Sequence, residues 1–103
     1  MRLVLSRLAL AELDDILGYL SERSPLGAKH VEARIRRAFD HIARYPAAAE
    51  RVDERPAVRR LPLARYPYVI YYELGTETVT ILRILHGARQ RPWSRADEPA
   101  QSS

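Results

Sequence analysis

Apolar residues recur at helical spacing in two consecutive stretches near the start of the chain. The first stretch follows Ser6, a residue type that caps helix N-termini, and ends at residues 21–23. The second follows Ser24 and Pro25, which suit the cap and first turn of a new helix, and ends before Pro46. The apolar positions are Leu13, Ile16, Leu17 and Leu20 in the first stretch, and Ala28, Val31, Ile35, Ala38, Phe39 and Ile42 in the second. Two amphipathic helices with so short a joint predict an antiparallel helical hairpin.

The segments on either side of this hairpin have the character of strands. Residues 2–5 form a short apolar run, and residues 59–63 form another, in which Pro62 indicates an edge strand. Residues 68–74 and 78–85 are rich in β-prone side chains, and the turn between them predicts a β-hairpin. Residues 47–57 carry charges and a proline, which predicts a surface loop.

The order strand, helix, helix and then three strands predicts an α+β domain (β-α-α-β-β-β). We expect the helical hairpin to pack on one face of a small antiparallel sheet and the other face to be open. The core candidates from the sheet are Leu61, Leu63, Ile70, Leu82 and Ile84. The last strand is apolar on both of its faces, because Val79, Ile81 and Leu85 alternate with Leu82 and Ile84. A bulge near Arg83 would turn residues from both sets toward the core.

Length and composition limit the possible classes of protein. At 103 residues the chain suits one domain, which we place at residues 1–95, followed by a flexible C-terminal tail at 96–103. It has no cysteine, and its three histidines show no ligand spacing, so we expect neither a metal nor another cofactor. No stretch is apolar enough for a membrane span or a secretory leader, which predicts a cytoplasmic protein with no membrane partner.

The charge is basic and comes almost entirely from arginine. The net charge is +4, and Lys29 is the only lysine among the 17 basic residues. The strand region interleaves arginines with aromatic side chains: Arg59, Arg60, Arg65, Arg83, Arg89 and Arg91 with Tyr66, Tyr68, Tyr71, Tyr72 and Trp93. Such a surface can bind nucleic acid through phosphate contacts and stacking, or it can bind a protein. Ordinary strand tyrosines with solvated arginines remain the alternative.

Short motifs in a fixed order resemble the RelE/ParE superfamily of bacterial type II toxin–antitoxin toxins over residues 2–93. The segments are Ala11-Glu12-Leu13-Asp14-Asp15-Ile16, Ser24-Pro25, Val58-Arg59-Arg60-Leu61, Tyr66-Pro67-Tyr68-Val69-Ile70-Tyr71-Tyr72 and Ile81-Leu82-Arg83-Ile84-Leu85-His86-Gly87-Ala88-Arg89. The last two segments are most similar to the ParE branch. The fold that this resemblance implies agrees with the fold expected from the residues.

The resemblance leaves two activities open. ParE-like members inhibit DNA gyrase, which makes Arg60, Tyr68, Arg83, Arg89 and Trp93 the expected target-binding residues, with no catalytic residue. RelE-like members cut messenger RNA on the ribosome, which would make Arg59, Arg60, His86 and Arg89 catalytic. Gly87 follows His86 where related nucleases place a tyrosine, and Tyr68 replaces an expected cation. These departures favour the ParE reading.

The resemblance also implies partners. We expect a cognate antitoxin, ParD-like or related, in a heterotetramer or larger assembly that contacts operator DNA only through the antitoxin. The expected antitoxin-binding residues are Leu13, Leu17, Leu20, Arg34 and Phe39. An inactive homologue or a general RNA-binding module is the alternative from another class; for such a module, RNA affinity would fall steeply with salt.

The C-terminal boundary leads to a first prediction. Deleting residues 96–103 removes no apolar stripe, so the truncated chain should melt within a few degrees of the full chain. Thermal unfolding followed by circular dichroism measures this. A large loss of melting temperature would place the boundary of the domain further toward the C-terminus.

Overall fold

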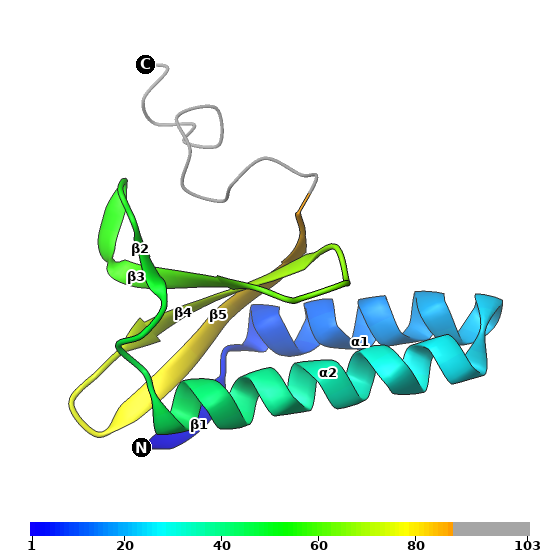
Figure 1. Cartoon of the computed structure of the whole chain (residues 1–103), viewed down its shortest axis with the longest axis horizontal. Helices are drawn as coiled ribbons and strands as arrows, with labels where there is room; N and C mark the ends of the chain where they lie inside the picture. Colours follow the sequence, from blue (N-terminus) through cyan, green and yellow to red (C-terminus); the bar gives the residue numbers. More distant parts are fainter. Residues whose placement is uncertain (88–103) are drawn as a thin grey trace.

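Two helices form one layer of the molecule and five strands form the other (Figure 1). The computed structural model describes residues 1–87. The elements are β1 (Arg2–Leu5), α1 (Arg7–Arg23), α2 (Pro25–Arg44), β2 (Glu50–Val52), β3 (Arg55–Pro62), β4 (Tyr68–Leu74) and β5 (Thr78–His86). The predicted α+β fold with a helical hairpin on one face of a sheet is confirmed. None of the helices in these residues is long and apolar enough to cross a membrane.

Both helices begin at the serines that the sequence indicated. The Ser6 hydroxyl accepts a hydrogen bond from the Ala9 N–H, and the Ser24 hydroxyl accepts one from the Gly27 N–H. Each satisfies a backbone donor that the first helical turn leaves without a partner. Ser24 serves both helices, because its N–H also donates to the Leu20 carbonyl at the end of α1. The turn between the helices is therefore very short, and the hairpin projects beyond the sheet (Figure 1).

The sheet has the strand order β1-β5-β4-β3-β2 and is mixed rather than wholly antiparallel. β1 pairs with β5 in parallel, whereas the other neighbours are antiparallel. The segment expected to be a loop, residues 47–57, instead contains β2, so β3 is not an edge strand. Pro62 is tolerated because the pairing of β2 reaches only Arg60, which leaves that side of Pro62 without a neighbouring strand.

The predicted bulge in the last strand is confirmed. Tyr71 pairs with Arg83 and Tyr72 pairs with Ile81, so Leu82 is an extra residue with no partner on β4. The bulge reverses the parity of β5, and both Ile81 and Ile84 therefore enter the main core. The assignment of Leu82 to that core was wrong, because this side chain packs with a smaller cluster instead.

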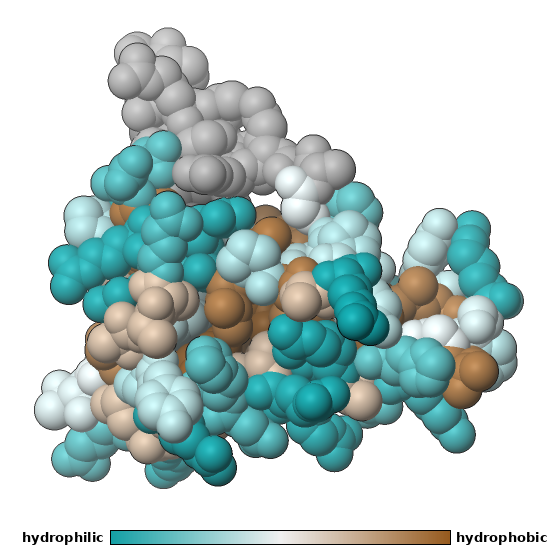
Figure 2. Space-filling view, in the orientation of Figure 1, coloured by the Kyte–Doolittle hydropathy of each residue, from teal (hydrophilic) through white to brown (hydrophobic). Residues whose placement is uncertain are grey.

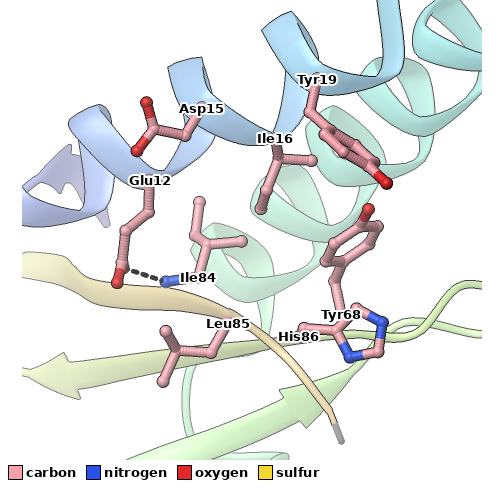
Figure 3. Close-up of a pocket in the computed structure, with 8 residues that line it drawn as sticks. All are labelled: Glu12, Asp15, Ile16, Tyr19, Tyr68, Ile84, Leu85 and His86. Atoms are coloured by element: carbon pink, nitrogen blue, oxygen red, sulfur yellow. Dashed lines mark hydrogen bonds between the residues drawn. The ribbon is translucent and has the colours of Figure 1, made fainter. Parts of the chain in front are cut away.

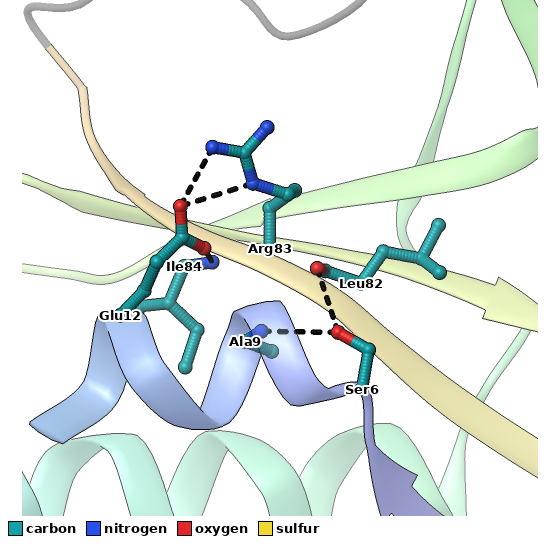
Figure 4. A network of polar contacts seen from close by, with 6 residues as sticks. All are labelled: Ser6, Ala9, Glu12, Leu82, Arg83 and Ile84. Atoms are coloured by element: carbon teal, nitrogen blue, oxygen red, sulfur yellow. Dashed lines mark hydrogen bonds and ion pairs between the residues drawn. The ribbon is translucent and has the colours of Figure 1, made fainter.

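Side chains of the N-terminal segment bind the backbone of β5 at the bulge (Figure 4). The β1–β5 pairing ends at Leu5 and Ile81, and beyond it the Ser6 hydroxyl donates to the Leu82 carbonyl at 3.0 Å. One residue past Arg83, the Ile84 N–H donates to the Glu12 carboxylate at 2.9 Å. Ser6 and Glu12 thus replace the strand that β5 lacks here, and this part of the sheet edge is not left with unpaired groups.

The main core lies between the helices and the sheet. Its fully buried large side chains include Ile35 and Ile42 from α2 and Ile70, Tyr72, Ile81 and Ile84 from the sheet. The Tyr72 hydroxyl donates to the Pro46 carbonyl at 2.6 Å, which ties the end of α2 to β4. Burial raises the pKa of Tyr72, although the positive charge of Arg59 acts in the opposite direction.

The opposite face of the sheet is not uniformly polar. A second cluster consists of Val52, Val58, Val69, Tyr71 and Leu85, with Leu82 at its margin. We call this side the open face, because the helices cover the other one. The cluster gives the open face a rigid apolar base beneath the charged side chains that lie on it.

The double role of Ser6 leads to a prediction about stability. Ser6→Ala removes both the helix cap and the hydrogen bond to Leu82, and it should lower the free energy of unfolding by about 2 kcal/mol. Urea unfolding measures the change. Ser21→Ala, an exposed serine in α1, is the control and should change stability by less than about 0.5 kcal/mol. Equal effects of the two variants would refute the role of Ser6.

Candidate functional site

Three side chains align across the middle of the open face. The register pairs Arg60 of β3 with Tyr71 of β4, and Tyr71 with Arg83 of β5. Directly opposed residues of neighbouring strands point to the same face, so the three form a line that we call the arginine–tyrosine row. Tyr71 is 3% exposed, so the two arginines flank a fixed aromatic ring.

Arg60 is held weakly within the chain. Its Nη1 lies 3.4 Å from a carboxylate oxygen of Glu50, whose side chain is 72% exposed. An ion pair with so exposed a partner contributes little to stability. Its Nε is buried and has no hydrogen-bond partner within residues 1–87. The weak contact with Glu50 leaves the terminal guanidinium nitrogens of Arg60 able to exchange that partner for another.

Arg83 is held strongly, by Glu12 of α1. Its Nε and Nη2 donate to the same carboxylate oxygen at 3.0 and 2.7 Å, while the other oxygen accepts from the Ile84 N–H (Figure 4). Charge-assisted contacts of this kind orient a guanidinium as well as stabilise it. Glu12 thus fixes Arg83 at the edge of the open face and joins α1 to the row.

Three of the four residues of the nuclease interpretation lie in the described chain, and these three do not come together. Arg59 lies on the helix-facing side of β3 and donates to the carbonyls of Ala47 and Ala49 at 3.1 and 2.8 Å. His86 pairs with Tyr68 on that same side, at the far end of the sheet, with the two rings edge to face. Arg60 lies on the open face, and Arg89 lies outside the described residues.

The expected target-binding residues are likewise divided. Arg60 and Arg83 share the open face, but Tyr68 points toward the helices and is 9% exposed. Trp93, like Arg89, lies outside the described residues. Tyr71, which the sequence analysis named only within a larger cluster, occupies the place between the two arginines. Because side chains alternate along a strand, the sequence could have placed Tyr68 and Tyr71 on opposite faces of the sheet. That Tyr71 lies between Arg60 and Arg83 follows only from the strand register and the bulge.

The residues expected to bind an antitoxin are mostly engaged in the core. Leu13, Leu17, Leu20 and Phe39 are partly buried against the main cluster, and Arg34 is partly buried on α2. The exposed apolar side chains are different ones: Leu8, Leu10, Tyr19, Leu26 and Tyr45, with Met1. Hydrophobic residues also show at the end of the helical hairpin (Figure 2), where Leu26 is 64% exposed. Leu8, Tyr19 and Leu26 lie off the apolar stripes of the two helices, and this position was the signal in the sequence.

A cleft of about 540 Å³ opens between α1 and the ends of β4 and β5 (Figure 3). Tyr19 and Tyr68 point toward one another from its two sides, and His86 lies next to Tyr68. The residues that line it are Glu12, Asp15, Ile16, Tyr19, Tyr68, Ile84, Leu85 and His86. Asp14 and Asp15 are adjacent, and their carboxylates point to different sides of α1; only Asp15 faces the cleft. Within residues 1–87 no group of acidic, histidine or cysteine side chains is arranged to hold a metal ion.

Comparison with known proteins identifies the family. The model of the family described as the ParE toxin of the type II toxin–antitoxin system parDE matches residues 3–91. The chain belongs to this toxin family. It is therefore a toxin of a type II toxin–antitoxin system, and an antitoxin partner follows from that class of system. The suspected membership of the RelE/ParE superfamily is confirmed.

The chain is similar to named toxins and to a solved toxin–antitoxin structure. A putative toxin, Y4kP, of Sinorhizobium fredii is 39% identical over 84 residues, which cover 82% of this chain and 85% of the relative. Toxin RelE2 of Caulobacter vibrioides is 40% identical over 81 residues, which cover 79% of this chain and 89% of the relative. A solved structure of the chromosomal ParDE system from P. aeruginosa matches with a TM-score of 0.73 at 28% identity, over 84% of this chain and 95% of that one.

The contacts of Glu12 lead to a prediction that separates its charge from its shape. Glu12→Ala leaves Arg83 and the Ile84 N–H without their partner and should cost about 3 kcal/mol of unfolding free energy. Glu12→Gln keeps an acceptor for Ile84 and should cost less. Glu22→Ala, at an exposed acidic position of the same helix, should be nearly neutral. Urea unfolding tests this order; a Glu12→Ala variant as stable as Glu22→Ala would contradict it.

Proposed function

We propose that this toxin inhibits DNA gyrase and is neutralised by a cognate antitoxin. The observation that carries the proposal is the separation of the nuclease candidates. Arg59 is bound to backbone carbonyls on the covered face, Arg60 lies on the open face, and His86 packs edge to face with Tyr68 at the sheet's end. Acid–base chemistry on one phosphate requires groups within hydrogen-bond reach of the same reacting atoms. The described chain offers a binding surface in place of such a group.

The arginine–tyrosine row is the part of that surface suited to the target. Arginine and tyrosine are enriched where proteins bind one another, because each combines a broad planar surface with hydrogen-bond donors. Here the two arginines stand on a sheet beside the buried Tyr71 and its apolar cluster, so little conformational entropy is lost on binding. Arg89 and Trp93, which lie outside the described residues, complete the proposed set of target-binding residues.

For the antitoxin we propose a ParD-like chain with an acidic segment that folds on binding, in a heterotetramer or larger assembly. Net charge supports this partner, since a toxin at +4 attracts acidic segments. Operator DNA would be contacted by the antitoxin. We place the complex in the cytoplasm, where both gyrase and the antitoxin gene product are made.

Ribosome-dependent cleavage of messenger RNA is the second candidate. The observation in its favour is that a relative at 40% identity is named toxin RelE2. Under this candidate the row would hold the RNA backbone, and His86 and Arg89 would act on the scissile phosphate. The two candidates differ in what the loss of His86 does.

A paired assay on the purified full chain, freed of antitoxin, tests the proposal. One arm measures gyrase supercoiling and trapped cleavage complexes, and the other follows messenger RNA on translating ribosomes. We expect gyrase inhibition that falls roughly tenfold in Arg60→Ala, as when a central interface arginine is lost. Arg89→Ala should also weaken it, whereas His86→Ala should leave it unchanged.

The matched control is Arg36→Ala, which removes an arginine with a 73% exposed side chain from α2, far from the open face. It should inhibit gyrase like the unchanged toxin. Messenger RNA cuts that disappear in His86→Ala, with supercoiling intact, would establish the nuclease instead. If neither arm responds, the inactive or RNA-binding alternative holds.

A further inference from the structure

The cleft beside α1 exists because β1 is shorter than β5. Pairing between the two strands ends at Leu5 and Ile81, while β5 continues to His86. Past that point α1 runs along the edge of β5 and approaches it through Glu12. The space left between the helix and the ends of β4 and β5 is the cleft of about 540 Å³, a volume in the range of ligand pockets.

The walls of the cleft combine apolar, aromatic and acidic groups. Ile16 and Ile84 form apolar walls, and Tyr19 and Tyr68 face one another across one end (Figure 3). The Glu12 carboxylate already accepts three hydrogen bonds, from Arg83 and Ile84. Asp15 forms no ion pair within residues 1–87, so it supplies the uncompensated negative charge. The lining residues include no arginine or lysine.

One wall already attracts a cation. The guanidinium carbon of Arg23 lies 3.8 Å from the centroid of the Tyr19 ring. The face of a tyrosine ring is electron-rich and favours cations within about 6 Å. An anionic ligand would be repelled by the carboxylates of Asp15 and Glu12. The only side-chain hydrogen-bond donors in the lining are the tyrosine hydroxyls and the His86 imidazole.

We propose that the cleft binds one basic side chain, arginine or lysine, of a partner polypeptide. The aliphatic stem would lie against Ile16 and Ile84, and the charged head would reach Asp15 and the tyrosines. This inference rests on the proposed function, in which the partner is the antitoxin. It adds a contact of opposite sign to the one expected at the basic open face.

The flank of α1 indicates why the ligand is part of a chain. Residues 8, 12, 15 and 19 follow helical spacing and lie along one side of α1. Leu8 and Tyr19 on this side are 49% and 55% exposed. A segment lying along the flank can therefore bury apolar surface at Leu8 while its basic residue enters the cleft. A single basic residue in an otherwise acidic antitoxin segment would fix how that segment is aligned along α1.

The first experiment uses the full chain labelled with ¹⁵N and followed by NMR. The probe is N-acetyl-arginine amide, and the control is N-acetyl-citrulline amide, which has nearly the same shape without the charge. We expect saturable shifts of the Asp15, Tyr19 and His86 signals with the arginine probe and weaker ones with citrulline. Equal shifts with both probes would overturn the assignment of a cationic ligand.

Matched variants locate the binding. Asp15→Asn should raise the apparent Kd of the arginine probe roughly threefold, as for one partly exposed charge pair, whereas Asp14→Asn should leave it unchanged. Tyr19→Leu should weaken binding, and Tyr45→Leu, which removes an equally exposed tyrosine, should not. All four positions are exposed, so the fold should persist. Equal effects of Asp15→Asn and Asp14→Asn would refute the site.

A third probe, free arginine, separates the two sources of the basic group. Binding of the capped probe that equals or exceeds that of free arginine supports a polypeptide ligand. Tighter binding of free arginine would overturn that part of the proposal. These readouts do not depend on toxicity: failure of gyrase inhibition with intact arginine binding would reject the proposed target and leave the cleft, and the reverse result would reject the cleft alone.

Discussion

The extra residue at Leu82 is the constraint on which the arrangement of the toxin depends. The bulge lies where the pairing of β1 with β5 ends, so backbone groups on this edge of β5 have no neighbouring strand, and polar groups without partners are costly. Here the partners are side chains from the other end of the chain, Ser6 and Glu12. Because each also performs a task in α1 or on Arg83, the helix, the sheet edge and the open face are positioned together. A change at the bulge would move all three.

Local rules in the sequence were sufficient for most of the fold. Serine caps, Pro25 and the apolar stripes located both helices, and conflicting parity in the last strand revealed the bulge near Arg83. The parallel pairing of β1 with β5 was not accessible in this way, because it joins segments more than 70 residues apart. β2 was missed because a three-residue strand rich in charge has no period of its own. The face of the sheet on which Leu82 lies could be assigned only from the strand register.

The candidate site was harder to predict than the fold. Arg60 and Arg83 were recognised as candidates, but no local pattern indicates that Tyr71 rather than Tyr68 lies between them. Tyr19 and Asp15 had no distinguishing signal, since a cleft is made by elements that meet only in the folded chain. The names of similar proteins do not decide between the activities either, because a RelE-named relative and a ParDE structure both match this chain. The proposed gyrase activity therefore rests on which described residues share a face of the sheet.

The position of β5 also bears on how the protein is made. The last strand of the described chain lies between β1, the first to be synthesised, and β4. The sheet cannot close until the ribosome has released residues 78–86, since long-range strand pairing needs both partners. A chain interrupted earlier lacks the strand that carries Arg83 and receives both Ser6 and Glu12. A product interrupted before β5 therefore lacks the assembled open face.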